Sequence, residues 1–223
     1  MKNNVELVPS LLAFNINDWK YFFNQFINNG LSCVHFDVMD YEYVNNIAYN
    51  QNDFNFFLNN HSGLKAHVHL MVMDPLNEFI KYVSPQTESI CFHFDVYKNE
   101  NDVFKTIDEI KKYNIKSGIA INPNFKLNDY EKYLKKCEFI TIMGVYPGKG
   151  GQKFEKECLT NLVDIINWSK ENKKEFLIEI DGGMNFSTIP LVIKNSRFIV
   201  SGSFLEKNIE NIQEILSWMK KLV

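Results

Sequence analysis

The chain has 223 residues, of which 45% are hydrophobic and 23% are charged, and its formal net charge is −3 at pH 7. This composition is that of an ordinary globular protein and excludes disordered, collagen-like and disulfide-framework chains. The slight negative charge argues against nucleic acid as a partner, because affinity for that polyanion requires clustered lysine and arginine.

Short apolar runs with the length and composition of buried strands recur along the whole chain. They are VELVPSLLA (5–13), CVHFDVM (33–39), AHVHLMV (66–72), SICFHF (89–94), SGIAI (117–121), FITIMGV (139–145), FLIEI (176–180) and FIVSGS (198–203). Segments with helical spacing lie between them, and helix-start signals occur at Asn17-Asp18, Asp74-Pro75 and Asn101-Asp102. The pattern predicts a strand and a helix, repeated eight times.

Eight such units favour a closed (β/α)8 barrel of the α/β class over an open doubly wound sheet. No linker rich in Pro, Gly or Ser divides the chain, so we expect one domain over residues 1–223. Trp218 and Met219 lie on a final segment with helical spacing and are predicted to serve packing or an interface.

The N-terminal residues contain no apolar signal segment, and no stretch approaches the ~20 apolar residues of a membrane span. We therefore expect a cytoplasmic protein without membrane contact. The widely spaced cysteines are predicted to be reduced and buried, with a nucleophilic thiol as the alternative: Cys33, Cys91, Cys137 and Cys158. His61 is predicted to lie exposed in a turn.

The side chains that could do chemistry lie at the predicted strand ends, where the active groups of parallel barrels gather. His35, Asp37 and His69 occupy two runs with the period of a strand, and Asp181 ends a third run. Two histidines and two carboxylates suit a divalent metal such as zinc, manganese, iron or cobalt, among which spacing does not choose. Each residue alone could instead be a hydrogen-bonded core residue.

His93 and Asp95 repeat the strand period at a fourth strand end. They are predicted to support the site or the structure and not to catalyse. A buried carboxylate is costly unless it is paired or bound to a metal, so a metal at this end of the barrel would offset that cost.

Three glycine clusters follow successive predicted strands: YPGKGGQ (146–152), DGG (181–183) and SGS (201–203). Glycine lets backbone N–H groups line a concavity for an anion, and many barrels hold phosphate in the loops after strands 7 and 8. Arg197 is the chain's one arginine, so a phosphate would be held mainly by backbone. Simple turns are the alternative.

A metal and a phosphate pocket at one barrel mouth predict a small sugar phosphate as the substrate. Two carboxylates suit proton abstraction next to a carbonyl, with the metal acting as a Lewis acid on the enediolate oxygens. Asp37 and Asp181 are then the acid and the base. Taking the proton from one face and returning it to the other would invert the carbon.

Read in order, these segments resemble the ribulose-phosphate 3-epimerase family along nearly the whole chain: VPSLLA, HFDVMD, HVHLMV, MGVYPGKGGQKF, IEIDGGMN and SGS. The resemblance implies a barrel of the ribulose-phosphate-binding type and a homo-oligomer. It implies an isomerase that interconverts D-ribulose 5-phosphate and D-xylulose 5-phosphate in the pentose phosphate pathway. It further implies one divalent metal ion, bound by His35, Asp37, His69 and Asp181, with both aspartates catalytic.

The resemblance also implies the residues that contact the substrate. Ser10 would contact it, and Met39, Met71 and Met143 would form a sulfur-lined wall, with core packing as the alternative for the methionines. The phosphate loops would comprise Gly148, Gly150, Gly151, Gly182, Gly183, Gly202 and Ser203.

The chain departs from the family's pattern at several positions. Tyr41 and Asn45 stand where the family has glycine and proline, and Tyr146 stands where Asn or Asp is common. Lys149 stands where Phe is common. It is predicted either to be an ordinary surface lysine or to direct a positive charge toward the phosphate.

Other functions remain open on the sequence. A D-allulose-6-phosphate 3-epimerase or a related ketose-phosphate epimerase would use the same barrel, and so would a non-catalytic sugar-phosphate-binding protein. The intact set of four metal ligands argues against the last. A decarboxylase or lyase lacks support, because no D-x-K-x-x-D pattern follows the DVMD run.

Overall fold

The computed structural model describes residues 5–60 and 63–223, so His61 lies outside the described residues. Eight strands run parallel in one sheet: β1 (Glu6–Pro9), β2 (Cys33–Met39), β3 (Lys65–Met71), β4 (Thr87–His93), β5 (Lys116–Ile121), β6 (Phe139–Met143), β7 (Leu177–Asp181) and β8 (Phe198–Ser201). The strands pair in the order β1-β8-β7-β6-β5-β4-β3-β2. A bridge between Ser10 and His35 joins β1 to β2, so the sheet curls into a nearly closed barrel.

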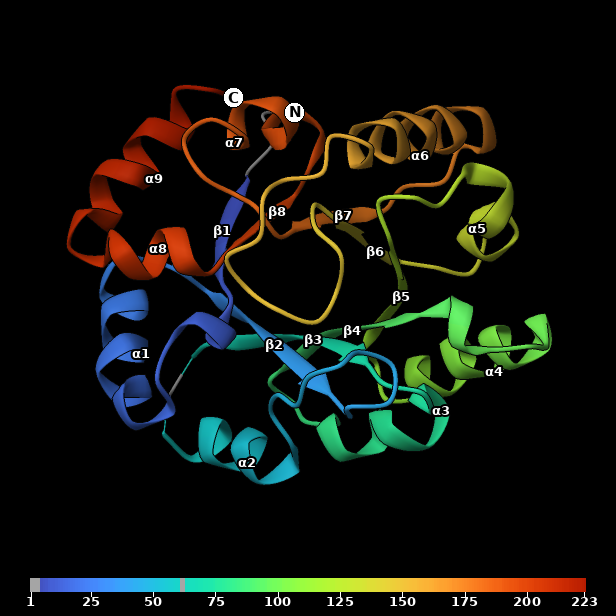
Figure 1. The fold of residues 1–223 in the computed structure, drawn as a ribbon, viewed down its shortest axis with the longest axis horizontal. Coiled ribbons are helices and arrows are strands. Elements are labelled where there is room, and N and C mark those ends of the chain that lie inside the picture. Colours follow the sequence, from blue (N-terminus) through green and yellow to red (C-terminus); the bar gives the residue numbers. More distant parts are fainter. Residues whose placement is uncertain (1–4, 61–62) are drawn as a thin grey trace.

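Helices surround the barrel as an outer ring (Figure 1). They are α1 (Trp19–Asn28), α2 (Gln51–Asn60), α3 (Pro75–Glu78), α4 (Glu100–Lys111), α5 (Leu127–Leu134), α6 (Cys158–Asn172), α7 (Ile189–Val192), α8 (Ser203–Lys207) and α9 (Ile212–Lys220). This arrangement confirms the predicted (β/α)8 barrel. None of the helices within residues 5–60 and 63–223 has the length and hydropathy of a membrane span.

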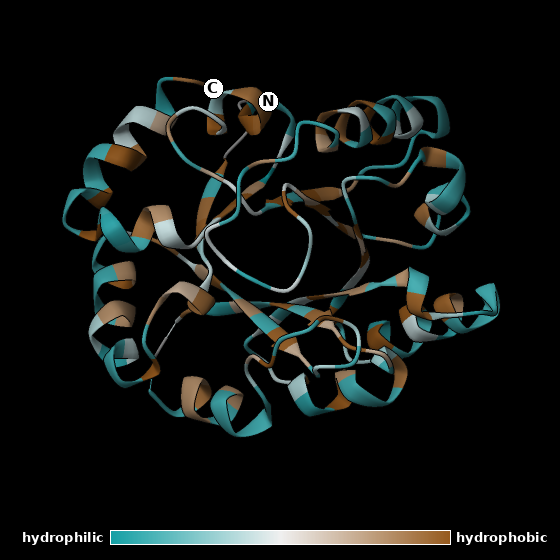
Figure 2. Cartoon of the chain, viewed as in Figure 1, coloured by the Kyte–Doolittle hydropathy of each residue, from teal (hydrophilic) through white to brown (hydrophobic). Residues whose placement is uncertain are grey.

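Along each strand, one side chain faces the helices and the next faces the barrel interior, because successive side chains of a strand point to opposite faces. On β2, Phe36 belongs to the large core between sheet and helices, where its ring meets that of Trp19 on α1 at 6.2 Å. Cys33 belongs to a separate interior cluster that includes Phe139 and Phe198. Figure 2 shows the ring helices with both apolar and polar surfaces, as this two-sided packing requires.

The cysteines and the last helix agree with the sequence analysis. All four cysteines lie in the described ranges as buried free thiols. Met219 on α9 is buried, and the ring of Trp218 packs edge-on against Phe186 at 5.0 Å. Both α9 residues therefore serve packing.

Several predicted boundaries differ from the structure. The first strand ends at Pro9, because Ala13 and Phe14 donate their backbone N–H groups to local carbonyls in a 3-10 turn over Leu11–Ala13. Helix α4 begins at Glu100, because the Asn99 side chain caps it from outside. Helix α3 begins at Pro75 with Asp74 as its cap, as the sequence predicts, but it is a single α-turn that continues as a 3-10 helix over Phe79–Tyr82.

Candidate functional site

Four metal-ligand candidates converge at the carboxyl ends of β2, β3 and β7. Asp37 is the register partner of His69 on the neighbouring strand. Nε2 of His35 lies 3.2 Å from Oδ1 of Asp37 and 3.5 Å from Oδ2 of Asp181. Nδ1 of His69 lies 3.4 and 3.6 Å from the same two oxygens. All four side chains are buried.

The geometry of this cluster fits a tetrahedral metal ion. One ligand atom from each of the four residues lies within 4.8 Å of all the others. Metal–ligand bonds of roughly 2.0–2.1 Å at a tetrahedral centre place the ligands roughly 3.3–3.4 Å apart, close to the four nitrogen–oxygen distances seen here. Nε2 of His35 and Nδ1 of His69 are buried and make no hydrogen bond within the described part of the chain. Both nitrogens therefore face the carboxylates and, once deprotonated, could bind a metal.

Mutual interactions set the charge of the cluster. Burial raises the pKa of Asp37, but the adjacent His35 and His69 rings outweigh it and hold that pKa well below its ordinary value. Burial lowers the pKa of His35, but Asp37, Asp181 and Glu179 outweigh it and raise the pKa well above its ordinary value. The site therefore favours an ionised Asp37 and attracts positive charge.

Asp37 and His69 are each held by a partner outside the cluster. The Ser10 hydroxyl donates a hydrogen bond to Oδ2 of Asp37 at 2.9 Å. Nε2 of His69 lies 2.8 Å from Nε2 of His93. Burial and the nearby His69 lower the pKa of His93 well below its ordinary value, which favours a neutral ring. His93 thus has the supporting place that the sequence predicted.

Asp95 lies farther out. The Tyr43 hydroxyl donates to it at 3.1 Å, and the Tyr43 ring packs over His93 with 4.7 Å between ring centroids. Tyr43, a loop residue, therefore covers His93, which contacts His69. Sequence reasoning missed Tyr43, because it lies in an irregular loop without a strand or helix period.

Glu179 is a buried residue that the sequence analysis also missed. Its Oε1 lies 3.3 Å from Nδ1 of His35, and its Oε2 lies 2.6 Å from Nδ1 of His67. Burial raises the pKa of Glu179, but the two histidines outweigh it and lower that pKa below its ordinary value. A signal existed, since Glu179 precedes Asp181 by two residues and so faces the same interior.

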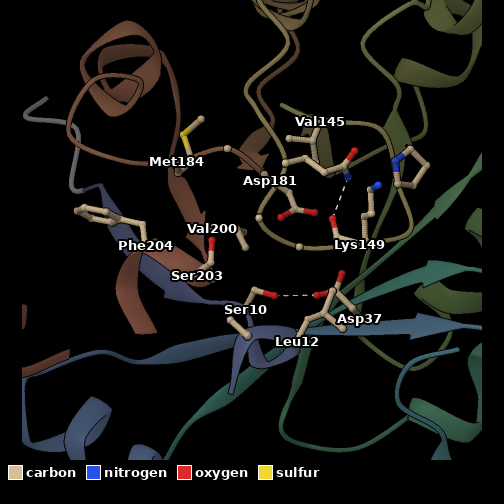
Figure 3. A pocket seen from close by; sticks show the side chains of 18 of the residues that line it. Ser10, Leu12, Asp37, Val145, Lys149, Asp181, Met184, Val200, Ser203 and Phe204 are labelled. Carbon is tan, nitrogen blue, oxygen red and sulfur yellow. Dashed lines mark hydrogen bonds between the residues drawn. The ribbon is translucent and has the colours of Figure 1, made fainter. Parts of the chain in front are cut away.

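A cavity of about 340 Å³ opens above the cluster and is lined by Asp37 and Asp181 (Figure 3). The structure brings every predicted substrate-contacting residue to it: Ser10, Met39, Met71, Met143, Gly148, Gly150, Gly151, Gly182, Gly183, Gly202 and Ser203. His35 and His69 do not line the cavity and lie buried beneath Asp37 and Asp181. Sequence reasoning missed further lining residues, among them Met184, Asn185, Lys207 and Asn208.

The glycine loops need glycine for conformational reasons. Gly182 and Gly183 have φ values of 99° and 71°, in the left-handed region that other residues rarely adopt. A Cβ at Gly183 would lie 2.9 Å from Cα of Phe154. The backbone after β7 is therefore packed closely against the loop after β6, at the edge of the cavity.

The departures from the family's pattern have visible consequences. Tyr41 adopts φ 67°, the left-handed conformation that favours glycine, and its side chain is exposed. Asn46, which follows the departing Asn45 and itself matches the pattern, donates its side-chain amide to the carbonyl of Gly148 at 2.7 Å and so ties the loop after β2 to the loop after β6. Tyr146 and Lys149 line the cavity.

Comparison with known proteins identifies the family. The sequence profile described as "Ribulose-phosphate 3 epimerase family" matches residues 6–205. The chain belongs to the ribulose-phosphate 3-epimerase family. It is 28% identical to the ribulose-phosphate 3-epimerase of Bacillus subtilis, over 89% of this chain and 91% of that protein. It is 30% identical to that of Aquifex aeolicus, over 92% and 91%.

Solved structures confirm the architecture of this ribulose-phosphate 3-epimerase family member. A mutant tryptophan synthase alpha-subunit from Pyrococcus furiosus superposes with a TM-score of 0.65, covering 100% of this chain and 97% of its own, at 13% identity. That likeness concerns the fold alone. Family membership confirms the predicted isomerase, and the buried cluster is a site that could bind the metal on which the family depends.

Proposed function

We propose that the protein is a divalent-metal-dependent epimerase that interconverts D-ribulose 5-phosphate and D-xylulose 5-phosphate. One observation carries the proposal: Asp37 and Asp181 lie on opposite sides of one cavity (Figure 3) and both approach the His35 nitrogen beneath it. Two carboxylates facing a shared space can act on opposite faces of one carbon.

The proposed reaction moves one proton off C3 of the sugar and another back onto it. One aspartate removes the C3 proton, which leaves an enediolate of the sugar, and the other aspartate protonates the opposite face. C3 is thereby inverted, and one carboxylate ends protonated and the other deprotonated until they exchange protons with solvent. The assignment of acid and base to Asp37 and Asp181 reverses with the direction of reaction.

The remaining residues bind and orient the sugar. Backbone N–H groups of the loops after β6, β7 and β8 hold the phosphate, and Met39, Met71 and Met143 exclude water beside the reacting carbon. His35, Asp37, His69 and Asp181 would hold the metal. A divalent metal, when bound, supplies Lewis-acid stabilisation of the negative charge that develops on the sugar oxygens. Homo-oligomerisation, a cytoplasmic location and a single domain stay predictions from the sequence.

The test is turnover after controlled metal loading. The protein is stripped with a chelator and reloaded separately with Zn²⁺, Mn²⁺, Fe²⁺ or Co²⁺, and epimerisation of D-ribulose 5-phosphate and D-allulose 6-phosphate is measured side by side. We expect activity to return with metal and kcat/KM to be higher for the pentose phosphate. A preference for the hexose phosphate would select that sister activity. Metal binding without turnover of either sugar would reject an epimerase.

A further inference from the structure

Glu179 lies inside the barrel directly below the metal-ligand cluster. It is 1% exposed, and its two carboxylate oxygens have different neighbours. Oε1 lies 3.3 Å from Nδ1 of His35 and accepts a hydrogen bond from the Thr141 hydroxyl at 3.2 Å. Oε2 lies 2.6 Å from Nδ1 of His67. The carboxylate therefore joins β7 to β2, β3 and β6 across the interior.

This contact acts on the side of His35 that faces away from the proposed metal. The ring directs Nε2 to Asp37 and Asp181 and Nδ1 to Glu179. Nδ1 of His35 makes no hydrogen bond within the described residues, so the 3.3 Å contact acts electrostatically. A carboxylate this close favours the tautomer that carries its proton on Nδ1, which leaves the Nε2 lone pair for a metal. It also resists rotation of the imidazole ring.

His67 holds Glu179 in turn. The His67 ring is 1% exposed and packs edge-on against Phe139 and Phe198, with ring centroids 5.1 and 4.5 Å away. Its Nδ1–H can donate to Glu179 over the short 2.6 Å contact. A buried carboxylate needs such partners, because an uncompensated charge in the interior is strongly destabilising.

We propose that Glu179 and His67 form a positioning pair that orients His35 for metal binding. Glu179 contacts the ligand, and His67 together with Thr141 fixes Glu179. The inference rests on the metal site of the proposed function, and it concerns the affinity and geometry of that site and not the proton transfer.

The test measures Co²⁺ and Zn²⁺ dissociation constants by competition with a chromophoric chelator. We expect Glu179→Gln to bind metal about 10- to 100-fold more weakly, the loss typical of an outer partner of a metal-bound histidine, and to change the visible spectrum of bound Co²⁺. Glu138→Gln is the matched control, since Glu138 is an exposed carboxylate that pairs with Lys111 and contacts neither His35 nor His67 within the described residues. We expect it to bind metal as the unaltered protein does.

Two further variants test the second half of the pair. His67→Leu removes the donor, and His67→Asn restores an N–H at the position of Nδ1. We expect His67→Leu to lose metal affinity and His67→Asn to recover part of it. If Glu179→Gln or His67→Leu fails to fold, Thr141→Val and His67→Asn provide the test instead. We expect the metal affinity of Thr141→Val to fall several-fold.

Unchanged metal affinity and an unchanged Co²⁺ spectrum in the folded variants would overturn the inference. A lower melting temperature of the metal-free protein with no change in affinity would also overturn it, because the pair would then serve only the fold. Failure of the proposed function has a different signature. The unaltered protein would then bind no metal, or would bind it without epimerising either sugar.

Discussion

Ser10 donates its hydroxyl hydrogen to Oδ2 of Asp37 across the closure between β1 and β2, at 2.9 Å. The other oxygen of that carboxylate, Oδ1, faces His35 and His69 at 3.2 and 3.4 Å. The hydrogen bond therefore fixes the rotation of the carboxylate: Oδ2 is held by Ser10, and Oδ1 faces the two histidines.

Removing this hydroxyl should slow turnover more than it weakens metal binding. A hydrogen bond to a charged group contributes about 1.5–3 kcal/mol, so we expect Ser10→Ala to lower kcat roughly 10- to 100-fold. Steady-state kinetics at saturating metal measures this. Ser117→Ala, a buried serine on β5 outside the cavity, is the control and should keep full activity. Equal rates for Ser10→Ala and the unaltered protein would show that the bond has no catalytic importance.

The loop after β7 should not tolerate a side chain at Gly183. Ala there must adopt a positive φ, at a cost of roughly 1–2 kcal/mol, and its Cβ would press on the Phe154 backbone. We expect Gly183→Ala to lower the free energy of unfolding in urea and to raise KM for the sugar phosphate. In the matched variant Gly150→Ala, the new Cβ meets no described atom within 4 Å, so both effects should be smaller. A reversed order of the two variants would contradict the structure.

The two lysines that line the cavity should add a modest attraction for phosphate. We expect Lys149→Ala and Lys207→Ala each to raise KM about two- to fivefold with kcat unchanged, as partly solvated charge pairs contribute about 0.2–1 kcal/mol. The effect should shrink as salt increases. A KM that does not depend on either lysine would leave phosphate binding to the backbone alone.

The cysteines should be unreactive while the protein is folded. Burial raises the pKa of the Cys137 and Cys158 thiols to about 12, so thiolate is scarce at pH 8. We expect Ellman's reagent to modify the native protein slowly and to detect four thiols after denaturation. Rapid labelling at pH 8 before unfolding would instead indicate an accessible nucleophilic cysteine.

Local patterns predicted most of the fold and the metal-ligand cluster. Each ligand candidate lies on a short buried strand, where a period of two residues determines which side chains share the interior. His35 and Asp37 could therefore be paired from spacing alone, and parallel strands bring His69 and Asp181 to the same end. Helix boundaries were less predictable. Asn99 caps α4, but Asn101 and Asp102 follow it and are equally good cap residues, so composition alone does not select the first residue of the helix.

Contacts across the barrel could not be predicted from spacing. Glu179 and His67 are separated by 112 residues and meet only after the sheet has closed. The same holds for Tyr43, which reaches His93 from an irregular loop. Strand periodicity determines which face a residue occupies, but it does not determine which residue on another strand it will touch.

Exchange of the C3 proton with solvent tests the central claim most directly. The metal-loaded protein is given D-ribulose 5-phosphate in deuterated water, and the deuteration of C3 and the formation of D-xylulose 5-phosphate are followed by NMR. The Asp37→Asn and Asp181→Asn variants are assayed in the same way after their metal occupancy has been measured. We predict that the unaltered protein deuterates C3 while forming product, and that each variant loses about 10²- to 10⁴-fold in turnover. Undiminished turnover in either metal-loaded variant, or product formation without deuterium at C3, would contradict proton transfer by two aspartates.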